Sequence, residues 1–311
     1  MKAIKVIDKK PVLLDVPEPK TEGVKVKVVS SSICGSDIHM IAQGAFGDHV
    51  IGHEFSGLTE DGRAVAIEPV TGCGQCGSCD EGHRIHCEAG LFVMGVLGDG
   101  GMAEYVTVPA ANLVVLPTGL DVRIASLIEP LAVAVHGLDR ARVRESDRVL
   151  VIGAGPIGLA TGAALRSRKI SYDIDARYDH QKVAAEKLGA GFHYDGHYDV
   201  VIDAVGSSAS LQQSAEMIKP LGRIGLVGIS WVNLELEQGF YAKEPELIPS
   251  LGYNCSYPNR NFDEAAMILL RHPDVSDCLV THRFPLDGVT EAFATAADRA
   301  GGAIKVVFDV A

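Results

Sequence analysis

The sequence predicts an α/β protein in which a doubly wound parallel sheet follows a β-rich segment. Three observations lead to this prediction. An apolar run, a glycine turn and a helical pattern follow one another at residues 147–165. Further apolar runs at 198–206 and 222–230 alternate with helical patterns, as in a parallel sheet with helices on both faces. Upstream of these elements, the segment 72–88 contains four cysteines.

Composition narrows the possible classes of function. A chain of 311 residues, of which 47% are hydrophobic, favours two domains with buried cores. The formal charge of −12 argues against nucleic-acid binding, which needs clustered Lys and Arg. No apolar run approaches the ~20 residues that span a bilayer, and the start "MKAIKVIDKK" lacks the features of a signal peptide. We therefore expect no membrane partner and a cytoplasmic location, where clustered cysteines bind metal more often than they form disulfides.

The cysteine cluster has the spacing of a structural metal site. Cys73, Cys76, Cys79 and Cys87 follow the pattern C-x2-C-x2-C-x7-C with interspersed glycines. Such a loop can place four sulfurs around one zinc ion at about 2.3 Å, which leaves no position for a substrate. Buried or disulfide-bonded cysteines are one alternative, and ligation of an iron–sulfur cluster is another.

A second group of possible metal ligands lies nearer the N-terminus. Cys34 stands in "SSICGSDIH", and His53 and Glu54 stand in "GHEFSG". One thiolate, one imidazole and one carboxylate can leave a coordination position of zinc open for water or substrate. This combination therefore predicts a catalytic metal site.

With these motifs the chain resembles the zinc-dependent medium-chain dehydrogenase/reductase family, of alcohol and polyol dehydrogenase type. The matching pieces are "CGSDIH", "GHE", the four-cysteine lobe, "GGMAEYV", "IEPLAVAVHGL" and "VLVIGAGPIGL", in the order that the family has them. They cover nearly the whole sequence. The resemblance implies a GroES-like, β-rich catalytic domain and a doubly wound Rossmann cofactor domain.

The resemblance also implies a set of ligands for catalytic zinc. Cys34 and His53 match zinc ligands of the family, and Glu54 is a ligand in some states of the metal. The remaining ligand falls on Glu129 of "IEPLAV", directly or through water. Alternatively, Glu129 only caps a helix that begins near Pro130. With the cysteine lobe, the expectation is two zinc ions per chain.

A zinc ion lowers the pKa of bound water to about 7 and should acidify a coordinated alcohol in the same way. Ser36 matches the hydroxyl of the family's proton relay, and His39 matches its outer histidine, whose pKa suits delivery to solvent. As an alternative, Ser36 and Asp37 only fix the loop by hydrogen bonds to the backbone.

The glycine turn predicts a dinucleotide site. Gly153, Gly155 and Gly158, with Pro156 and Ile157 between them, form G-x-G-x-x-G between a strand and a helix. The first glycine makes the turn, the second admits the pyrophosphate and the third lets helix and strand pack. By resemblance, Val205, Val227 and Gly228 would border the cofactor.

The choice between NAD and NADP depends on the end of the second strand. An acid there holds the ribose hydroxyls of NAD, whereas a small residue followed by Arg admits the 2′-phosphate of NADP. Counting back from "KLGA" places Ala176 at the acid's position and Arg177 beside it, whereas counting forward from the glycines leaves Asp175 possible. The sequence favours NADP and leaves NAD open.

We expect a catalytic domain over residues 1–131 with the zinc lobe at 72–88, an NAD(P)-binding domain over 132–253, and a return to the catalytic domain over 254–311. The leading hypothesis is a zinc-dependent dehydrogenase that oxidises a secondary alcohol, polyol or sugar, or reduces the matching ketone. A metal-free quinone or enone reductase of the same fold and a non-catalytic nucleotide-sensing protein are the alternatives. The expected partners are the small-molecule substrate and further copies of the chain, as a homodimer or homotetramer.

Overall fold

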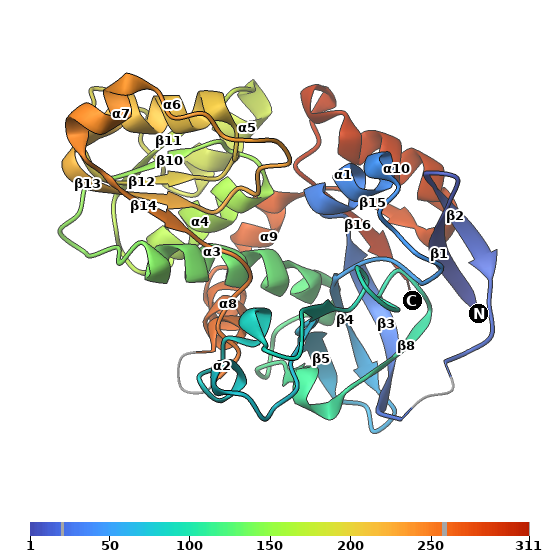
Figure 1. Ribbon diagram of the computed structural model, residues 1–311. Helices are drawn as coiled ribbons and strands as arrows, with labels where there is room; N and C mark the ends of the chain where they lie inside the picture. Colours follow the sequence, from blue (N-terminus) through green and yellow to red (C-terminus); the bar gives the residue numbers. More distant parts are fainter. Residues whose placement is uncertain (20–21, 257–259, 311) are drawn as a thin grey trace. The chain divides into compact units, whose positions relative to one another are not determined.

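The computed structural model describes residues 1–19, 22–256 and 260–310, which divide into two compact units. Unit 1 comprises Met1–Glu129 and Asn254–Ala311, and unit 2 comprises Pro130–Tyr253 (Figure 1). The first division therefore falls at Glu129, against residue 131 in the sequence analysis. No helix of the described residues is long and apolar enough to cross a membrane.

Unit 1 is built on a seven-stranded sheet with the order β15-β16-β3-β4-β5-β9, and β8 pairs with β3. Its central strands β3, β4 and β16 are antiparallel to their neighbours, except that β15 and β16 run parallel. The strands of this sheet are β3 (Val24–Ser32), β4 (Glu54–Thr59), β5 (Ala64–Ile67), β8 (Tyr105–Val108), β9 (Leu113–Val115), β15 (Val280–Pro285) and β16 (Lys305–Asp309).

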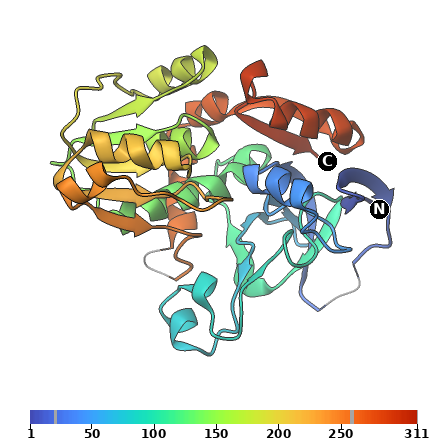
Figure 2. The ribbon, with the colours of Figure 1, turned by 45° about the horizontal axis from the view of Figure 1, so that its top comes forward.

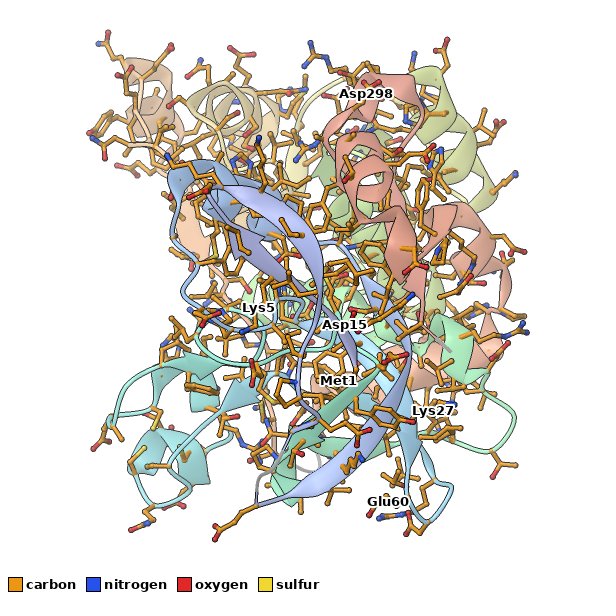
Figure 3. All side chains as sticks on the ribbon, turned by 90° about the vertical axis from the view of Figure 1, so that its right-hand side faces the viewer. Met1, Lys5, Asp15, Lys27, Glu60 and Asp298 are labelled. Carbon is orange, nitrogen blue, oxygen red and sulfur yellow. The ribbon has the colours of Figure 1, made fainter. Side chains whose placement is uncertain are left out.

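Two small ribbons complete the β-structure of unit 1. The hairpin of β1 (Lys2–Ile7) and β2 (Lys10–Asp15) turns at Asp8 and Lys9, both with positive φ, as a tight two-residue turn requires. Met1 and Asp15 lie together at the open end of this hairpin (Figure 3). The second ribbon pairs β6 (Val70–Thr71) with β7 (Phe92–Val93), and it forms the base of the cysteine lobe.

Both segments of unit 1 contain helices. They are α1 (Gly35–Gln43), α2 (Gly77–Asp80), α8 (Asn261–Arg271), α9 (Asp274–Leu279) and α10 (Val289–Ala297). The short 3-10 segments are Arg84–His86, Ala110–Asn112, Val122–Leu127, Leu286–Gly288 and Arg299–Gly301. Helix α3 (Ile128–Arg140) begins in unit 1 and continues in unit 2.

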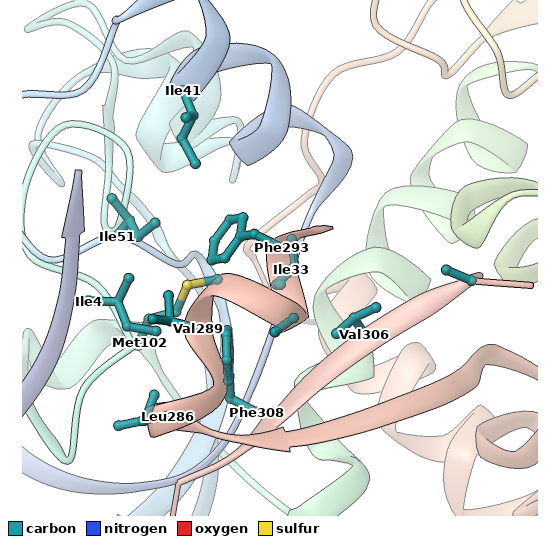
Figure 4. Close-up of a cluster of buried hydrophobic side chains, with 12 residues drawn as sticks. Ile4, Ile33, Ile41, Ile51, Met102, Leu286, Val289, Phe293, Val306 and Phe308 are labelled. Atoms are coloured by element: carbon teal, nitrogen blue, oxygen red, sulfur yellow. The ribbon is translucent and has the colours of Figure 1, made fainter. Parts of the chain in front are cut away.

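A buried apolar cluster joins the first and last parts of the chain in unit 1 (Figure 4). Phe308 of β16 and Phe293 of α10 pack with their ring centroids 6.2 Å apart. Ile33, which precedes Cys34, and Ile51, which precedes the "GHE" motif, belong to the same cluster. Because burial of such side chains removes apolar area from water, the C-terminal segment stabilises both loops that carry the expected metal ligands.

Unit 2 contains a parallel five-stranded sheet with the order β11-β10-β12-β13-β14. Helix α4 packs against β10 and β11, whereas α6 and α7 pack against β12 and β13 on the other face (Figures 1 and 2). This is the doubly wound sheet that the sequence predicts. Its elements are β10 (Val149–Ile152), α4 (Pro156–Ser167), β11 (Tyr172–Asp175), α5 (Asp179–Lys187), β12 (Tyr198–Asp203), α6 (Ser208–Met217), β13 (Ile218–Leu226), α7 (Gln238–Lys243) and β14 (Glu246–Pro249).

Candidate active site

Cys34 lies at the start of helix α1, just after strand β3 ends. Asp37, in the first turn of this helix, accepts a hydrogen bond from the backbone N–H of Cys34 at 2.9 Å through Oδ2. Asp37 is fully buried, and an acid at this position closes the helix start as half of a capping box. The cap fixes the backbone from which the Cys34 thiol projects.

His53 and Glu54 lie where the chain enters strand β4. Gly52 before them has φ +98°, and a Cβ there would lie 2.5 Å from Cγ of Met102, so only glycine fits this turn. The turn brings both side chains to Cys34: one ligand atom from each of the three residues lies within 4.8 Å of the others. The structure thus brings together the three residues that the sequence places in one site.

The donor set of this site fits a zinc ion. His53 is buried, and its Nδ1 lies 3.3 Å from Oδ1 of Asp37, yet neither atom makes a hydrogen bond within the described residues. Burial would lower the pKa of His53, but Asp37 and Cys34 raise it well above its usual value. Buried polar atoms without partners are rare, and here they lie beside a thiol and a carboxylate, the ligands that zinc prefers.

Glu54 has a partner that sequence reasoning missed. Nζ of Lys305, on strand β16, lies 2.8 Å from each carboxylate oxygen of Glu54, and both side chains are 1% exposed. The hydroxyl of Ser32 donates a further hydrogen bond to Glu54. Burial would lower the pKa of Lys305, but Glu54 and Cys34 raise it. A lysine in the apolar strand "AIKVVF" is the one signal in the sequence that could have drawn attention to it.

Glu129 lies in the first turn of α3 and is buried. Burial and the neighbouring Glu54 raise the pKa of its carboxyl to about 7, against the opposing effect of His53. Glu129 therefore shares the electrostatic surroundings of the metal-ligand group. Its oxygens are not part of the group within 4.8 Å that Cys34, His53 and Glu54 form.

Ser36 and His39 lie on α1, beyond Cys34. Burial and the nearby Arg299 lower the pKa of His39. Arg299 comes from the C-terminal segment, and its Nη2 lies 3.6 Å from where a Cβ on Gly35 would be. This arginine was not among the residues that the sequence indicates, because nothing in "AADRAGG" connects it with residues 34–39.

The cysteine lobe also assembles a group of ligands. One atom from each of its four cysteines lies within 4.8 Å of the others: Cys73, Cys76, Cys79 and Cys87. No cysteine among the residues that the structure describes forms a disulfide. Backbone N–H groups of Glu88 and Cys79 lower the pKa of the Cys76 thiol to about 7. A Cβ on Gly72 would lie 2.5 Å from Sγ of Cys79, so the loop closes this tightly only with glycine there. Four convergent thiols, of which Cys76 and Cys87 have a lowered pKa, fit a tetrahedral zinc ion.

In unit 2 the geometry of the glycine turn explains why glycine is needed at two of its positions. Gly153 has φ +91°, and a Cβ on Gly158 would lie 1.7 Å from the carbonyl oxygen of Gly153. At Gly155, in contrast, no atom lies within 4 Å of an added Cβ. Pro156 occupies the first turn of α4, and Ile157 follows it. The space left open at Gly155, at a helix N-terminus, fits a pyrophosphate.

Val205, Val227 and Gly228 follow strands β12 and β13 at the same edge of the sheet as the glycine turn. A Cβ on Gly228 would lie 2.5 Å from the backbone of Val205, which shows how closely the two segments approach. Buried Asp203, which sequence reasoning did not single out, accepts hydrogen bonds from the N–H groups of Val205 and Gly206 at 2.8 and 3.0 Å. It therefore fixes the turn that carries Val205.

Asp175 is the last residue of β11, and its Oδ2 accepts a hydrogen bond from Nε2 of Gln213 at 2.8 Å. Arg177 is exposed, and its guanidinium lies over the ring of Tyr178 at 5.5 Å. The same ring stacks on His180 with centroids 5.6 Å apart. The described residues form no ion pair with Arg177, so its charge faces solvent at the end of the second strand.

Comparisons with known proteins agree with this architecture. The model of the alcohol dehydrogenase GroES-like domain matches residues 20–118, and that of the glucose dehydrogenase C-terminus matches residues 122–310. The chain is 32% identical to L-arabinitol 4-dehydrogenase of Talaromyces emersonii, over 97% of this chain and 89% of that protein. It is 30% identical to L-galactonate-5-dehydrogenase of Escherichia coli K12, over 90% of this chain and 89% of that protein.

A solved structure extends the likeness to three dimensions. An alcohol dehydrogenase from Escherichia coli CFT073, crystallised with NADH, superposes with a TM-score of 0.85 at 29% identity, covering 99% of each chain. The matched domains, the curated relatives and this superposition all cover both units. The chain therefore belongs to the zinc-type medium-chain dehydrogenase/reductase family.

Proposed function

We propose that this chain is a zinc-dependent oxidoreductase that transfers hydride between NAD(P) and a secondary alcohol of a polyol or sugar, with the ketone as substrate in the reverse direction. The observation that supports this most directly is the convergence of Cys34, His53 and Glu54 within 4.8 Å. Beside it, Nδ1 of His53 and Oδ1 of Asp37 are buried and make no hydrogen bond within the described residues. Membership of the dehydrogenase family supports the same reaction class.

In this proposal Cys34, His53 and Glu54 hold the catalytic zinc, and Glu129 completes the set directly or through water. The ion and a bound nicotinamide would supply, respectively, a lowered pKa of the substrate hydroxyl and an acceptor for hydride. The Ser36 hydroxyl accepts the proton of the substrate hydroxyl and passes it outward. His39, whose lowered pKa keeps its imidazole neutral at pH 7, takes up that proton and releases it to solvent.

The substrate class rests on the relatives and on Glu129. The names of the two relatives place their reactions at carbon 4 of L-arabinitol and carbon 5 of L-galactonate, which are inner carbons with secondary hydroxyls. By resemblance, Glu129 stands where classical alcohol dehydrogenases have cysteine and where polyol dehydrogenases commonly have Glu-Pro. Both indications favour a polyhydroxylated substrate over a simple primary alcohol.

A second zinc ion is proposed for the cysteine lobe, which gives two per chain. Four thiolates saturate the ion, so this site stabilises the lobe and takes no part in the reaction. Because zinc-binding thiolates must remain reduced, the proposal includes a cytoplasmic location. A homodimer or homotetramer stays a prediction, which light scattering on the purified protein would test.

For the cofactor we propose a preference for NADP over NAD. Asp175 is already engaged by Gln213, Ala176 is small, and Arg177 presents a charge without an acidic partner among the described residues. A guanidinium at this place suits the 2′-phosphate. NAD remains the alternative, since one similar protein of known structure was crystallised with NADH and Asp175 could release Gln213.

Two measurements test this function. A panel of polyols, sugars and secondary alcohols is assayed with both cofactors at 340 nm, and the metal content is determined on the same preparation. Turnover together with two zinc ions per chain supports the proposal. One zinc ion with reduction of quinones or enones would favour the metal-free reductase, whereas cofactor binding without turnover would favour a nucleotide sensor.

A further inference from the structure

Two acids end the strands on either side of β10, and helix α6 binds both of them. Asp175 of β11 and Asp203 of β12 are each in register with Ile152 of β10. The hydroxyl of Ser210 donates to Oδ2 of Asp203 at 2.8 Å. Nε2 of Gln213 donates to Oδ2 of Asp175, also at 2.8 Å. Because residues three apart lie on one face of a helix, a single face of α6 contacts the ends of both strands.

The two carboxylates differ in how completely they are occupied. Asp203 is fully buried and accepts two further hydrogen bonds from the backbone of the turn that follows it. Asp175 is half-buried, and among the described residues only Gln213 donates to its carboxylate. The backbone carbonyl of Asp175 accepts a hydrogen bond from the N–H of Gly153 at 3.0 Å. The main chain of Asp175 is therefore fixed beside the glycine turn, and the direction of its side chain depends on Gln213.

The direction of this carboxylate matters for the choice of cofactor. Asp175 ends the second strand of the nucleotide fold, where an acid that faces the ribose binds the hydroxyls of NAD. A carboxylate that faced the ribose would also repel the 2′-phosphate of NADP, because like charges at short range are unfavourable. The hydrogen bond from Gln213 draws Oδ2 toward α6 instead. Two residues further on, the exposed Arg177 has no ion pair within the described residues and suits a phosphate.

We propose that Gln213 is a positioning residue that sets the cofactor preference: it holds the carboxylate of Asp175 against α6, away from the ribose, and so favours NADP over NAD. The inference rests on the proposed function, in which Arg177 binds the 2′-phosphate. It assigns the selection between the two cofactors to a helix that lies beyond the second strand and the glycine turn. Gln213 acts through Asp175.

The test measures the dissociation constants of NAD and NADP by calorimetry on the zinc-loaded protein, so that no turnover is needed. Gln213→Met keeps the length of the side chain and removes the donor. NAD should then bind more tightly and NADP more weakly, and the ratio of the two constants should shift roughly tenfold toward NAD. Gln212→Met is the matched control, because Gln212 donates to Glu216 of the same helix at 3.0 Å. It should leave the ratio unchanged.

A second pair of variants tests whether the effect passes through the acid. Gln213→Met/Asp175→Asn should give the same ratio as Asp175→Asn alone, since no charged carboxylate is left to release. An unchanged ratio in folded Gln213→Met overturns the proposal, and so does a shift that persists in the double variant. If Gln213→Met fails to fold, Asp175→Asn decides by itself: unchanged binding of NAD supports the proposal, and weaker binding of NAD overturns it.

The same measurements separate this inference from the proposed reaction. A wild type that binds NADP more tightly than NAD, and in which Gln213→Met shifts the ratio, supports the inference even if no alcohol is oxidised. Tighter binding of NAD by the wild type overturns the inference, whereas turnover of a polyol with NAD would leave the proposed reaction standing. A zinc-loaded protein that binds neither cofactor defeats both.

Discussion

Glu68 and Arg260 form a bidentate ion pair across 192 positions of sequence, with Nε and Nη2 of Arg260 donating to the two carboxylate oxygens at 2.8 and 2.7 Å. Glu68 is fully buried, and burial raises its pKa against the opposing effect of Arg260. Arg84, from within the cysteine lobe, makes a longer contact of 3.3 Å to the same carboxylate. One buried acid thus links the lobe to the segment that returns to unit 1.

Loss of Arg260 should destabilise the protein. Arg260→Met leaves Glu68 with only its longer contact to Arg84, so the free energy of unfolding should fall by about 3 kcal/mol, at the low end for a broken buried pair. Urea denaturation of the metal-loaded protein measures this loss. Arg283→Met breaks an exposed pair with Asp309 and serves as the control, with an expected loss below ~1 kcal/mol. Equal losses of unfolding free energy in the two variants would show that the buried pair stabilises the protein no more than the exposed pair does.

Two glycines of one turn should respond to alanine in opposite ways. A methyl group at Gly158 would lie 1.7 Å from a carbonyl oxygen, so Gly158→Ala should lower the stability of unit 2 by about 3 kcal/mol or more. Gly155 has φ −76° and open space, so Gly155→Ala should keep its stability within ~0.5 kcal/mol. Its methyl would meet the pyrophosphate instead, and the dissociation constant of the cofactor, measured by calorimetry, should rise roughly tenfold or more. Tight binding by Gly155→Ala would place the pyrophosphate elsewhere.

The two metal sites should be separable by mutation. Cys34→Ser should reduce the zinc content from two ions per chain to one and lower kcat at least about a hundredfold, because acidification of the substrate hydroxyl is lost. Its circular dichroism should not change. Cys79→Ser should lose the other ion and lower the melting temperature while the first site stays loaded. Normal turnover of Cys34→Ser would contradict the proposed chemistry.

Arg299 should set the acid limb of the activity profile. Burial and the charge of Arg299 lower the pKa of His39, so the neutral imidazole persists to lower pH than usual. Arg299→Gln removes the positive neighbour, which should raise that pKa and move the acid limb of kcat against pH upward. Arg299→Lys keeps the charge and should leave the limb in place. Identical profiles of kcat against pH for wild type and Arg299→Gln would show that His39 takes no part in the relay or that Arg299 does not affect its pKa.

Arg177 should determine whether the protein prefers NADP or NAD. Arg177→Gln should raise KM for NADP roughly tenfold with little effect on NAD, as expected when one charge-assisted contact to a phosphate is lost. Asp175→Asn is the matched variant on the other side of the choice. If it weakens NAD and leaves NADP unchanged while Arg177→Gln alters neither cofactor, the acid sets the preference.

The sequence could predict those sites whose residues lie close together in the chain. The spacing of Cys73 to Cys87 and the three glycines of the turn are local patterns, and the structure assembles both groups from contiguous chain. Lys305, Arg260 and Arg299 were missed because each reaches its partner across 192 residues or more. In their own segments Arg260 and Arg299 look like ordinary charged residues at the surface, and only the apolar neighbours of Lys305 distinguish it.

Element boundaries show a second limit of local patterns. Helix α3 begins at Ile128, so Glu129 lies inside its first turn rather than before it. Strand β13 begins at Ile218, earlier than the apolar run at 222–230 indicates, and the register shifts between Tyr198 and Val200 of its partner. In both places packing of the neighbouring elements, and not the local preference of the residues, decides where the element starts.

The central sheet of unit 1 has β16 beside β3, so residues 30–32 of β3 lack this neighbour until residues 307–309 have been synthesised. Unit 2 is continuous and can complete its own sheet earlier, while Glu54 in unit 1 still lacks its ion pair with Lys305. Because Lys305 lies on β16, a chain cut short before residue 305 would have a finished nucleotide fold and an unfinished metal centre.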